Sequence, residues 1–229
     1  MLQAKKLSKQ YDGTVALKNL DFSVAPGEIF CLLGQNGAGK TTTIHIFLGL
    51  IEPSSGEALI NNTSVISKAN RSAIAYIPEI VELYGNLSGI ENLDFFSRLA
   101  GHYYSKEELS NYLQQVNLKE EAHKNKLATY SKGMRQKVGI AIALAKKASY
   151  ILMDEPTSGL DPKASVEFAK TCKDLANKGV GILMATHDIF NAVNIGARIG
   201  IMKEGVLVHI TETKDISAQQ LQELYIKTI

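Results

Sequence analysis

Residues 29–41 read IFCLLGQNGAGKT, an apolar run that passes directly into a glycine-rich loop. The run from Ile29 to Leu33 has no alternation of polar and apolar side chains, which is typical of a strand buried on both faces of a sheet. The loop from Gly34 to Gly39 leads into Lys40 and Thr41, where we predict that a helix begins. A strand, a glycine loop and a helix in this order match the pattern of a loop that holds phosphate groups.

The residue types of this loop suit a bound nucleotide. Glycines let consecutive backbone amides turn inward onto phosphate oxygens, and the start of a helix adds the positive end of its dipole. We expect Lys40 to reach the β and γ phosphates and the Thr41 hydroxyl to bind Mg²⁺. The expected nucleotide contacts are Gly34, Asn36, Gly37, Ala38, Gly39, Lys40, Thr41 and Thr42. A tight turn between strand and helix, with no ligand, is the alternative interpretation.

The composition excludes several classes of protein. The 229 residues are 45% hydrophobic and 21% charged, which is ordinary for a globular chain with a buried core. A formal charge of +2 does not suggest a nucleic-acid partner. Cys31 and Cys172 lie far apart and have no Cys or His at ligand spacing, so we expect neither a zinc site nor a disulfide framework. No apolar run reaches the roughly 18 residues of a membrane-spanning helix, so a membrane role is expected to come through a partner.

Apolar runs rich in Val, Ile, Leu and Phe predict strands on both sides of a helical segment. They are residues 2–7 and 15–24, expected to form an antiparallel layer; residues 150–153 and 181–185, expected to pair in parallel across a helix that Asp161 caps; and residues 198–210, expected to form a hairpin before a helix that begins after Ser217. The fold class is therefore α/β.

Between about Ser88 and Ala148 the pattern changes to helices. Capping boxes at residues 88–91 and 105–108 mark two helix starts, and a third helix follows Ser131. In the third helix we expect one apolar stripe toward the core and one charged face toward solvent. The stripe is Met134, Val138, Ile142 and Ala145, and the charged residues are Arg135, Lys137, Lys146 and Lys147. We expect an inserted helical subdomain over residues 88–148.

Residues 151–155 read ILMDE, a buried strand that carries Asp154 and Glu155 to its carboxyl end, where open α/β sheets bind ligands. Because side chains alternate along a strand, the two carboxylates are expected to have different tasks. Asp154 would orient Mg²⁺, directly or through water, and Glu155 would act as the general base for an attacking water. A solvated turn before Pro156 is the alternative interpretation of this pair.

Three further motifs join the phosphate loop and the carboxylate pair, and the set resembles the ATP-binding subunit of ABC transporters. They are Tyr130-Ser-Lys-Gly-Met134-Arg-Gln-Lys137, Ser158-Gly-Leu-Asp161 and Ala185-Thr-His187-Asp188, in the order that this family has. The resemblance covers nearly the whole chain. It implies one ABC ATP-binding domain over residues 1–229, with a P-loop NTPase core of the RecA type over residues 1–87 and 149–229.

The resemblance also implies an activity and partners. We expect an ATPase that uses ATP and Mg²⁺, pairs with a second ATP-binding subunit in a homodimer or heterodimer, and binds a transmembrane permease. The expected location is cytoplasmic, at the inner face of the cell membrane. Dimer closure and opening, driven by ATP, would power transport. A soluble ABC ATPase without a membrane partner, or a nucleotide-gated scaffold with little turnover, are the alternatives.

Individual roles follow from the same resemblance. Ser131 and Gly133 would contact a γ-phosphate held by the other subunit, although a plain helix cap also explains Ser131. His187 would contact the γ-phosphate and hold Glu155 and the water in register; a histidine with a structural hydrogen bond at a strand end is the alternative. Residues 158–161 would lie along the dimer seam. Tyr11 would stack on adenine, unless it is a tyrosine of a surface turn.

The sequence departs from the family pattern in two places. Glu79, in Tyr76-Ile-Pro-Glu79, stands where most members carry glutamine, and the signature reads Tyr-Ser-Lys-Gly-Met rather than Leu-Ser-Gly-Gly-Gln. Glu79 is still an oxygen ligand for Mg²⁺ or water, but it adds negative charge close to the γ-phosphate. Lys132 either offsets phosphate charge or faces water.

Both departures resemble the branch of the family that exports drugs, antibiotics or sodium, so we expect an exporter. By the same resemblance, the permease would dock near Glu79 and the helical insertion. The apolar candidates for this contact are Leu83, Tyr84 and Leu87, which also suit a local core.

Overall fold

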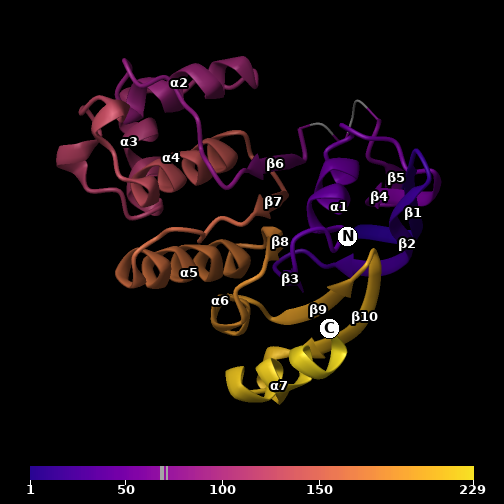
Figure 1. The fold of residues 1–229 in the computed structure, drawn as a ribbon. Helices are drawn as coiled ribbons and strands as arrows, with labels where there is room; N and C mark the ends of the chain where they lie inside the picture. Colours follow the sequence, from indigo (N-terminus) through magenta and orange to yellow (C-terminus); the bar gives the residue numbers. More distant parts are fainter. Residues whose placement is uncertain (68–69, 71) are drawn as a thin grey trace.

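The computed structural model describes residues 1–67, 70 and 72–229. Within them a sheet of six strands has the order β10-β9-β3-β8-β7-β6 (Figure 1). The strands are β3 (Ile29–Gly34), β6 (Ile74–Ile77), β7 (Tyr150–Asp154), β8 (Gly181–Thr186), β9 (Arg198–Lys203) and β10 (Val206–Glu212). Five of them run parallel, and β10 joins the edge as the second strand of an antiparallel hairpin. The predicted parallel pairing and the predicted hairpin are both confirmed.

Strand β3 lies inside this sheet and is fully buried, as its unbroken apolar run predicted. Its side chains divide between two cores, because alternate residues point to opposite faces. Ile29, Cys31 and Leu33 belong to one core, and Phe30 and Leu32 belong to the other. Helices α5 (Pro162–Asn177) and α6 (Ile189–Ile195) cover the first face, and α1 (Lys40–Phe47) covers the second.

A second sheet covers the outside of the α1 core. Its strands have the order β2-β1-β4-β5, and they are β1 (Leu2–Tyr11), β2 (Thr14–Val24), β4 (Ser55–Ile60) and β5 (Thr63–Ser64). All of its pairs are antiparallel, as predicted for the first two strands. Phe22 of β2 stacks on Phe30 of β3 with ring centroids 5.2 Å apart, so this layer packs directly on the parallel sheet.

The helices α2 (Gly89–Leu99), α3 (Lys106–Gln115) and α4 (Lys132–Ala145) form a separate group, away from the antiparallel sheet (Figure 1). Both predicted capping boxes are present: Ser88 and Ser105 accept backbone hydrogen bonds from Glu91 and Glu108, whose carboxylates accept in return. The last helix, α7 (Ala218–Thr228), begins with a third capping box at Ser217. Among the described residues, none of the helices is both long enough and apolar enough to cross a lipid bilayer.

The prediction that α4 has one apolar stripe toward the core and one charged face toward solvent is wrong. Helix α4 packs against α2, α3, α5 and β6, so buried residues occur on all of its sides. They include Gln136, Val138, Gly139, Ile140, Ala141, Ala143 and Ala145. Lys137 is half-buried and donates to Glu167 Oε2 at 2.7 Å, and half-buried Lys146 donates to the carbonyl of Ile74. Arg135 is half-buried too, and only Lys147 of the four charged residues is exposed.

Ile140 gives a direct test of this burial, because it lies on the side of α4 opposite to Val138 and is fully buried. Ile140→Ala should lower the free energy of unfolding by about 2–5 kcal/mol, the usual cost of a cavity in a well-packed core. Urea denaturation followed by circular dichroism measures this change. Leu99→Ala on the exposed side of α2, where the side chain is 74% exposed, is the matched control and should change little. Equal stability of the two variants would contradict the burial of α4 on all sides.

Candidate nucleotide site

The phosphate loop occupies the turn between β3 and α1. Gly37 and Gly39 have φ angles of +84° and +99°, in the left-handed region that favours glycine. A Cβ on Gly39 would lie 2.7 Å from the carbonyl oxygen of Ala16, so no larger residue fits there. Gly39 also caps α1 without a side-chain hydrogen bond, which leaves the first amides of the helix for an outside acceptor. This is a backbone arrangement that suits an anion.

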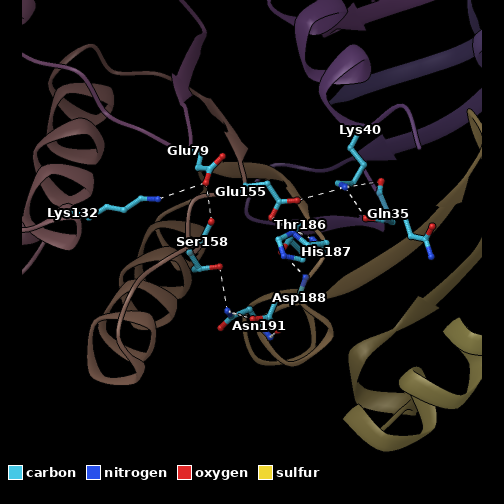
Figure 2. Close-up of polar contacts among 12 residues, drawn as sticks. Gln35, Lys40, Glu79, Lys132, Glu155, Ser158, Thr186, His187, Asp188 and Asn191 are labelled. Carbon is cyan, nitrogen blue, oxygen red and sulfur yellow. Dashed lines mark hydrogen bonds and ion pairs between the residues drawn. The ribbon is translucent and has the colours of Figure 1, made fainter. Parts of the chain in front are cut away.

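The ammonium group of Lys40 lies beneath this loop. The side chain is only 6% exposed, and Nζ donates to the carbonyls of Gly34 at 2.7 Å and Gln35 at 3.2 Å. The same nitrogen lies 3.5 Å from Glu155 Oε1 (Figure 2). Lys40 therefore connects the loop after β3 to the carboxylate that follows β7.

The two predicted carboxylates differ in backbone geometry as well as in position. Asp154 is the last residue of β7, whereas Glu155 lies beyond the strand with a φ of +44°. Strand alternation therefore describes Asp154 but not Glu155, which reaches its position through an unusual left-handed backbone. Its backbone amide donates to the carbonyl of Ala185 at 2.9 Å, which holds this turn against the end of β8.

Asp154 has the chemistry of a metal ligand. It is 8% exposed, and its Oδ1 is buried without a hydrogen-bond partner among the described residues. Burial raises the pKa of Asp154 above its ordinary value of 3.8, and the charge of Glu155 adds to the rise, while a hydrogen bond with the Thr41 side chain opposes it. An unpartnered carboxylate oxygen beside a hydroxyl is a suitable start for an Mg²⁺ site. The residues present thus fit the metal that the sequence predicts.

Glu155 is held from two sides. His187 Nδ1 lies 2.8 Å from Glu155 Oε2, on the other side of the carboxylate from Lys40, and the His187 backbone amide donates to the same oxygen at 3.3 Å. The His187 side chain is 58% exposed, and Figure 2 shows it next to the carboxylate. A base that is oriented by a buried cation and a surface histidine can accept a proton at a fixed place.

Glu79 lies at the edge of the same cavity. Residues from four segments line this cavity: Ala16, Gln35, Asn36, Gly37, Gly39, Lys40, Thr41, Thr42, Tyr76, Pro78, Glu79, Ile80, Glu82, Asp154 and Glu155. The structure thus brings together nine of the residues that were predicted to bind nucleotide or metal or to act in catalysis. They are Asn36, Gly37, Gly39, Lys40, Thr41, Thr42, Glu79, Asp154 and Glu155. Gly34 and Ala38 belong to the loop itself, but both are buried and do not line the cavity.

Four other predicted residues, Tyr11, Ser131, Gly133 and His187, do not line this cavity, and His187 lines a neighbouring cavity that Glu155 also lines. Tyr11, at the end of β1, is 41% exposed and has the Lys9 ammonium 4.9 Å above its ring centroid. Ser131 and Gly133 lie at the start of α4, where the Ser131 hydroxyl accepts from the amide of Met134 at 3.2 Å. The helix-cap interpretation of Ser131 is therefore confirmed. Neither Ser131 nor Gly133 lines the cavity of its own chain.

Tyr76 is a cavity residue that the sequence reasoning did not assign. It lies on β6, next to β7, and burial followed by the charge of Asp154 raises the pKa of its hydroxyl. Its proximity to Asp154 depends on the pairing of β6 with β7. No strand was predicted for residues 74–77, so the place of Tyr76 beside Asp154 did not follow from the sequence.

Comparison with known proteins agrees with this geometry. A family model described as ABC transporter matches residues 17–158. "Uncharacterized ABC transporter ATP-binding protein YhcH" of Bacillus subtilis (strain 168) is 37% identical over 219 residues, which cover 94% of this chain and 71% of that protein. "Linearmycin resistance ATP-binding protein LnrL" of the same organism is 35% identical over 224 residues, which cover 96% and 71%.

A solved structure supports the same assignment. It is a dimeric ATP-binding cassette in a post-hydrolysis state, bound to ADP and Pi. It is 28% identical to this chain, with a TM-score of 0.81, and the match covers 93% of this chain and 99% of the other. The fold, the phosphate loop and these matches agree, and the chain belongs to the ABC transporter family, in which it is an ATP-binding subunit and an ATPase.

Proposed function

We propose that this chain hydrolyses ATP to power an ABC exporter, and that Glu155 is its general base. The observation that carries the proposal is the position of the Glu155 carboxylate, with Lys40 Nζ at 3.5 Å on one side and His187 Nδ1 at 2.8 Å on the other. A carboxylate beside a phosphate-binding lysine can take the proton from a water that attacks the γ-phosphate. We further propose that residues 1–229 are one ABC domain, with residues 88–148 as its helical subdomain.

The phosphate loop and Lys40 would hold the triphosphate. Lys40 donates to the loop carbonyls of Gly34 and Gln35, and the β and γ phosphates would be further acceptors for its ammonium group. The same group lies beside Glu155, so phosphate binding would also change the charge that the base experiences. Tyr11 would stack on adenine from the end of β1.

Thr41, Asp154 and Glu79 would hold Mg²⁺, which supplies positive charge to the phosphate oxygens. The unpartnered Oδ1 of Asp154 and its hydrogen bond with the Thr41 side chain support this assignment. His187 would contact the γ-phosphate, since its side chain is 58% exposed and lies 2.8 Å from the proposed base Glu155.

A second subunit would complete the site. Ser131 and Gly133 begin α4 outside the cavity of their own chain, which suits a contact with the γ-phosphate of the other chain. The similar cassette that binds ADP and Pi is dimeric. Hydrolysis would remove the contacts specific to the γ-phosphate, so the closed pair would lose stability and open. Residues 158–161 would lie along the seam.

A permease would bind next to the loop that contains Glu79, and the subunit would thereby sit at the inner face of the membrane. Tyr84 is 49% exposed and packs edge to face on Phe95, which is 43% exposed, whereas Leu83 and Leu87 are half-buried. Exposed aromatic side chains of this kind are common at protein interfaces. The name of the linearmycin resistance relative supports export as the direction.

The general-base role predicts that Glu155→Gln keeps ATP binding while hydrolysis falls by about 10²- to 10⁴-fold, because the amide cannot accept the proton. Phosphate release measures the rate, and titration with a fluorescent ATP analogue measures binding. Glu121→Gln, at an exposed carboxylate of the helical part, is the control and should change neither. Near-normal turnover of Glu155→Gln would remove Glu155 from the role of base.

The phosphate role of Lys40 predicts that Lys40→Ala weakens ATP binding by about ten- to a hundredfold, because charge-assisted hydrogen bonds to phosphate are lost. The same titration measures the change. Since Lys40 also donates to Gly34 and Gln35, the midpoint of thermal unfolding should be measured in parallel. An unchanged titration curve in a folded variant would contradict the proposed phosphate site.

The buried position of Asp154 predicts a pH-dependent gain of stability in Asp154→Asn. Because the pKa of Asp154 is raised in the folded state, its contribution to stability is present below about pH 3.8 and is lost as the pH rises through the folded pKa. The variant avoids this loss, so without nucleotide it should melt at a higher temperature than the wild type at pH 7. The difference should shrink toward pH 4. Mg²⁺ with ATP should stabilise the wild type more than the variant, and the opposite order would exclude Asp154 as a metal ligand.

A further inference from the structure

Two positions at which the sequence departs from the family pattern meet in space. Lys132 Nζ, in the first turn of α4, lies 3.8 Å from Glu79 Oε1 in the loop after β6 (Figure 2). The residues are 53 positions apart in the sequence. We propose that Lys132 is a positioning residue that supplies the counter-charge for Glu79 within the same chain, so that this carboxylate can stand beside a triphosphate without repelling it. The inference rests on the proposed function, because it takes the nearby cavity to be the ATP site.

Helix α4 contacts the Glu79 loop through two side chains, one turn of the helix apart. Lys132 and Gln136 are four residues apart, so they lie on the same side of the helix. Gln136 is fully buried, and its Nε2 donates to the backbone carbonyls of Pro78 at 3.3 Å and Glu79 at 3.2 Å. These bonds fix the backbone of the loop. Lys132 acts one turn earlier, on the carboxylate itself.

A third segment fixes the direction of this carboxylate. The Ser158 hydroxyl donates to Glu79 Oε1 at 2.8 Å, so the same oxygen faces both Ser158 and Lys132. Next to Ser158, Thr157 Oγ1 accepts from Asn191 Nδ2 at 3.2 Å, and Asn191 also donates to Asp188. Figure 2 shows these contacts as a line from α4 to the segment that carries His187. Glu79 thus joins the helical part to the loops around the base.

The charge of Lys132 itself points to an acidic partner. A lysine in the first turn of a helix is unfavourable, because the helix dipole is positive there. The nearby carboxylate of Glu79 offsets this cost. In turn, Lys132 cancels a charge that would otherwise weaken the binding of an anionic nucleotide in the cavity that Glu79 lines. Both side chains are partly exposed, at 32% for Lys132 and 51% for Glu79, so the effect is screened by solvent.

The test is a double-mutant cycle of Lys132→Ala and Glu79→Gln, read by titration of the full chain with Mg²⁺ and a fluorescent ATP analogue. Lys132→Ala should weaken binding by about two- to fivefold when Glu79 is present, and should change little in the Glu79→Gln background. The loss should shrink in roughly 1 M salt, where exposed charges are screened. Lys132→Arg should restore binding. Lys124→Ala removes an exposed lysine of the same helical part and should have no effect.

Two results would overturn the inference. An equal loss in both backgrounds would mean that Lys132 acts on phosphate directly, and no loss in either background would mean that the pair has no role. The same cycle by thermal unfolding without nucleotide is a second readout, in which the pair predicts a coupling that disappears at high salt. If the wild type binds no ATP analogue, the proposed function fails, while the unfolding cycle still supports or overturns the ion pair.

Discussion

The parallel pairing of β3, β8 and β7 brings the site together, because strands in register end at one edge of the sheet. Leu33 pairs with Thr186, and Asp154 pairs with Ala185. The phosphate loop, the Asp154–Glu155 turn and His187 therefore begin within a residue or two of the same edge. Apolar burial on both faces of these strands holds that register, since a shift would move buried side chains out of two cores at once.

Burial also determines the electrostatics of this edge. Lys40 and Asp154 are both nearly inaccessible to solvent, and Glu155 is only 15% exposed. The single positive charge of Lys40 balances only one of the two carboxylates, Asp154 and Glu155, so one negative charge is left over. Burial is the main cause of the raised pKa of Asp154, and the charge of Glu155 adds to the rise. A ligand that brings Mg²⁺ would supply the missing positive charge, which couples nucleotide binding to the stability of the site.

Helix α4 connects the helical part to this edge. Its middle is buried on all sides, while its start lies at the surface, where Ser131 is exposed and Gly133 is half-buried. The same turn reaches Glu79, and Glu79 reaches Ser158. The loop after β6 therefore contacts both the segment that follows Glu155 and the start of α4, which we propose meets a second subunit.

The sequence alone determined those features that depend on residues close to one another along the chain. The strand, glycine loop and helix of residues 29–47, the capping boxes at Ser88 and Ser105, and the cap at Asp161 follow from local backbone and hydrogen-bond preferences, and all are present. The two phosphate-site motifs identified eight residues of the cavity, and the family resemblance added Glu79.

Tertiary structure alone decided the rest, because it depends on which distant segments pack together. The burial of α4 on all sides arises from four neighbours that its own periodicity does not encode. The left-handed backbone of Glu155, the place of Tyr76 beside Asp154 and the contact between Lys132 and Glu79 likewise require the assembled sheet and helices. The sequence shows which side chains carry charge, but which of them form ion pairs depends on how the folded chain packs distant segments together.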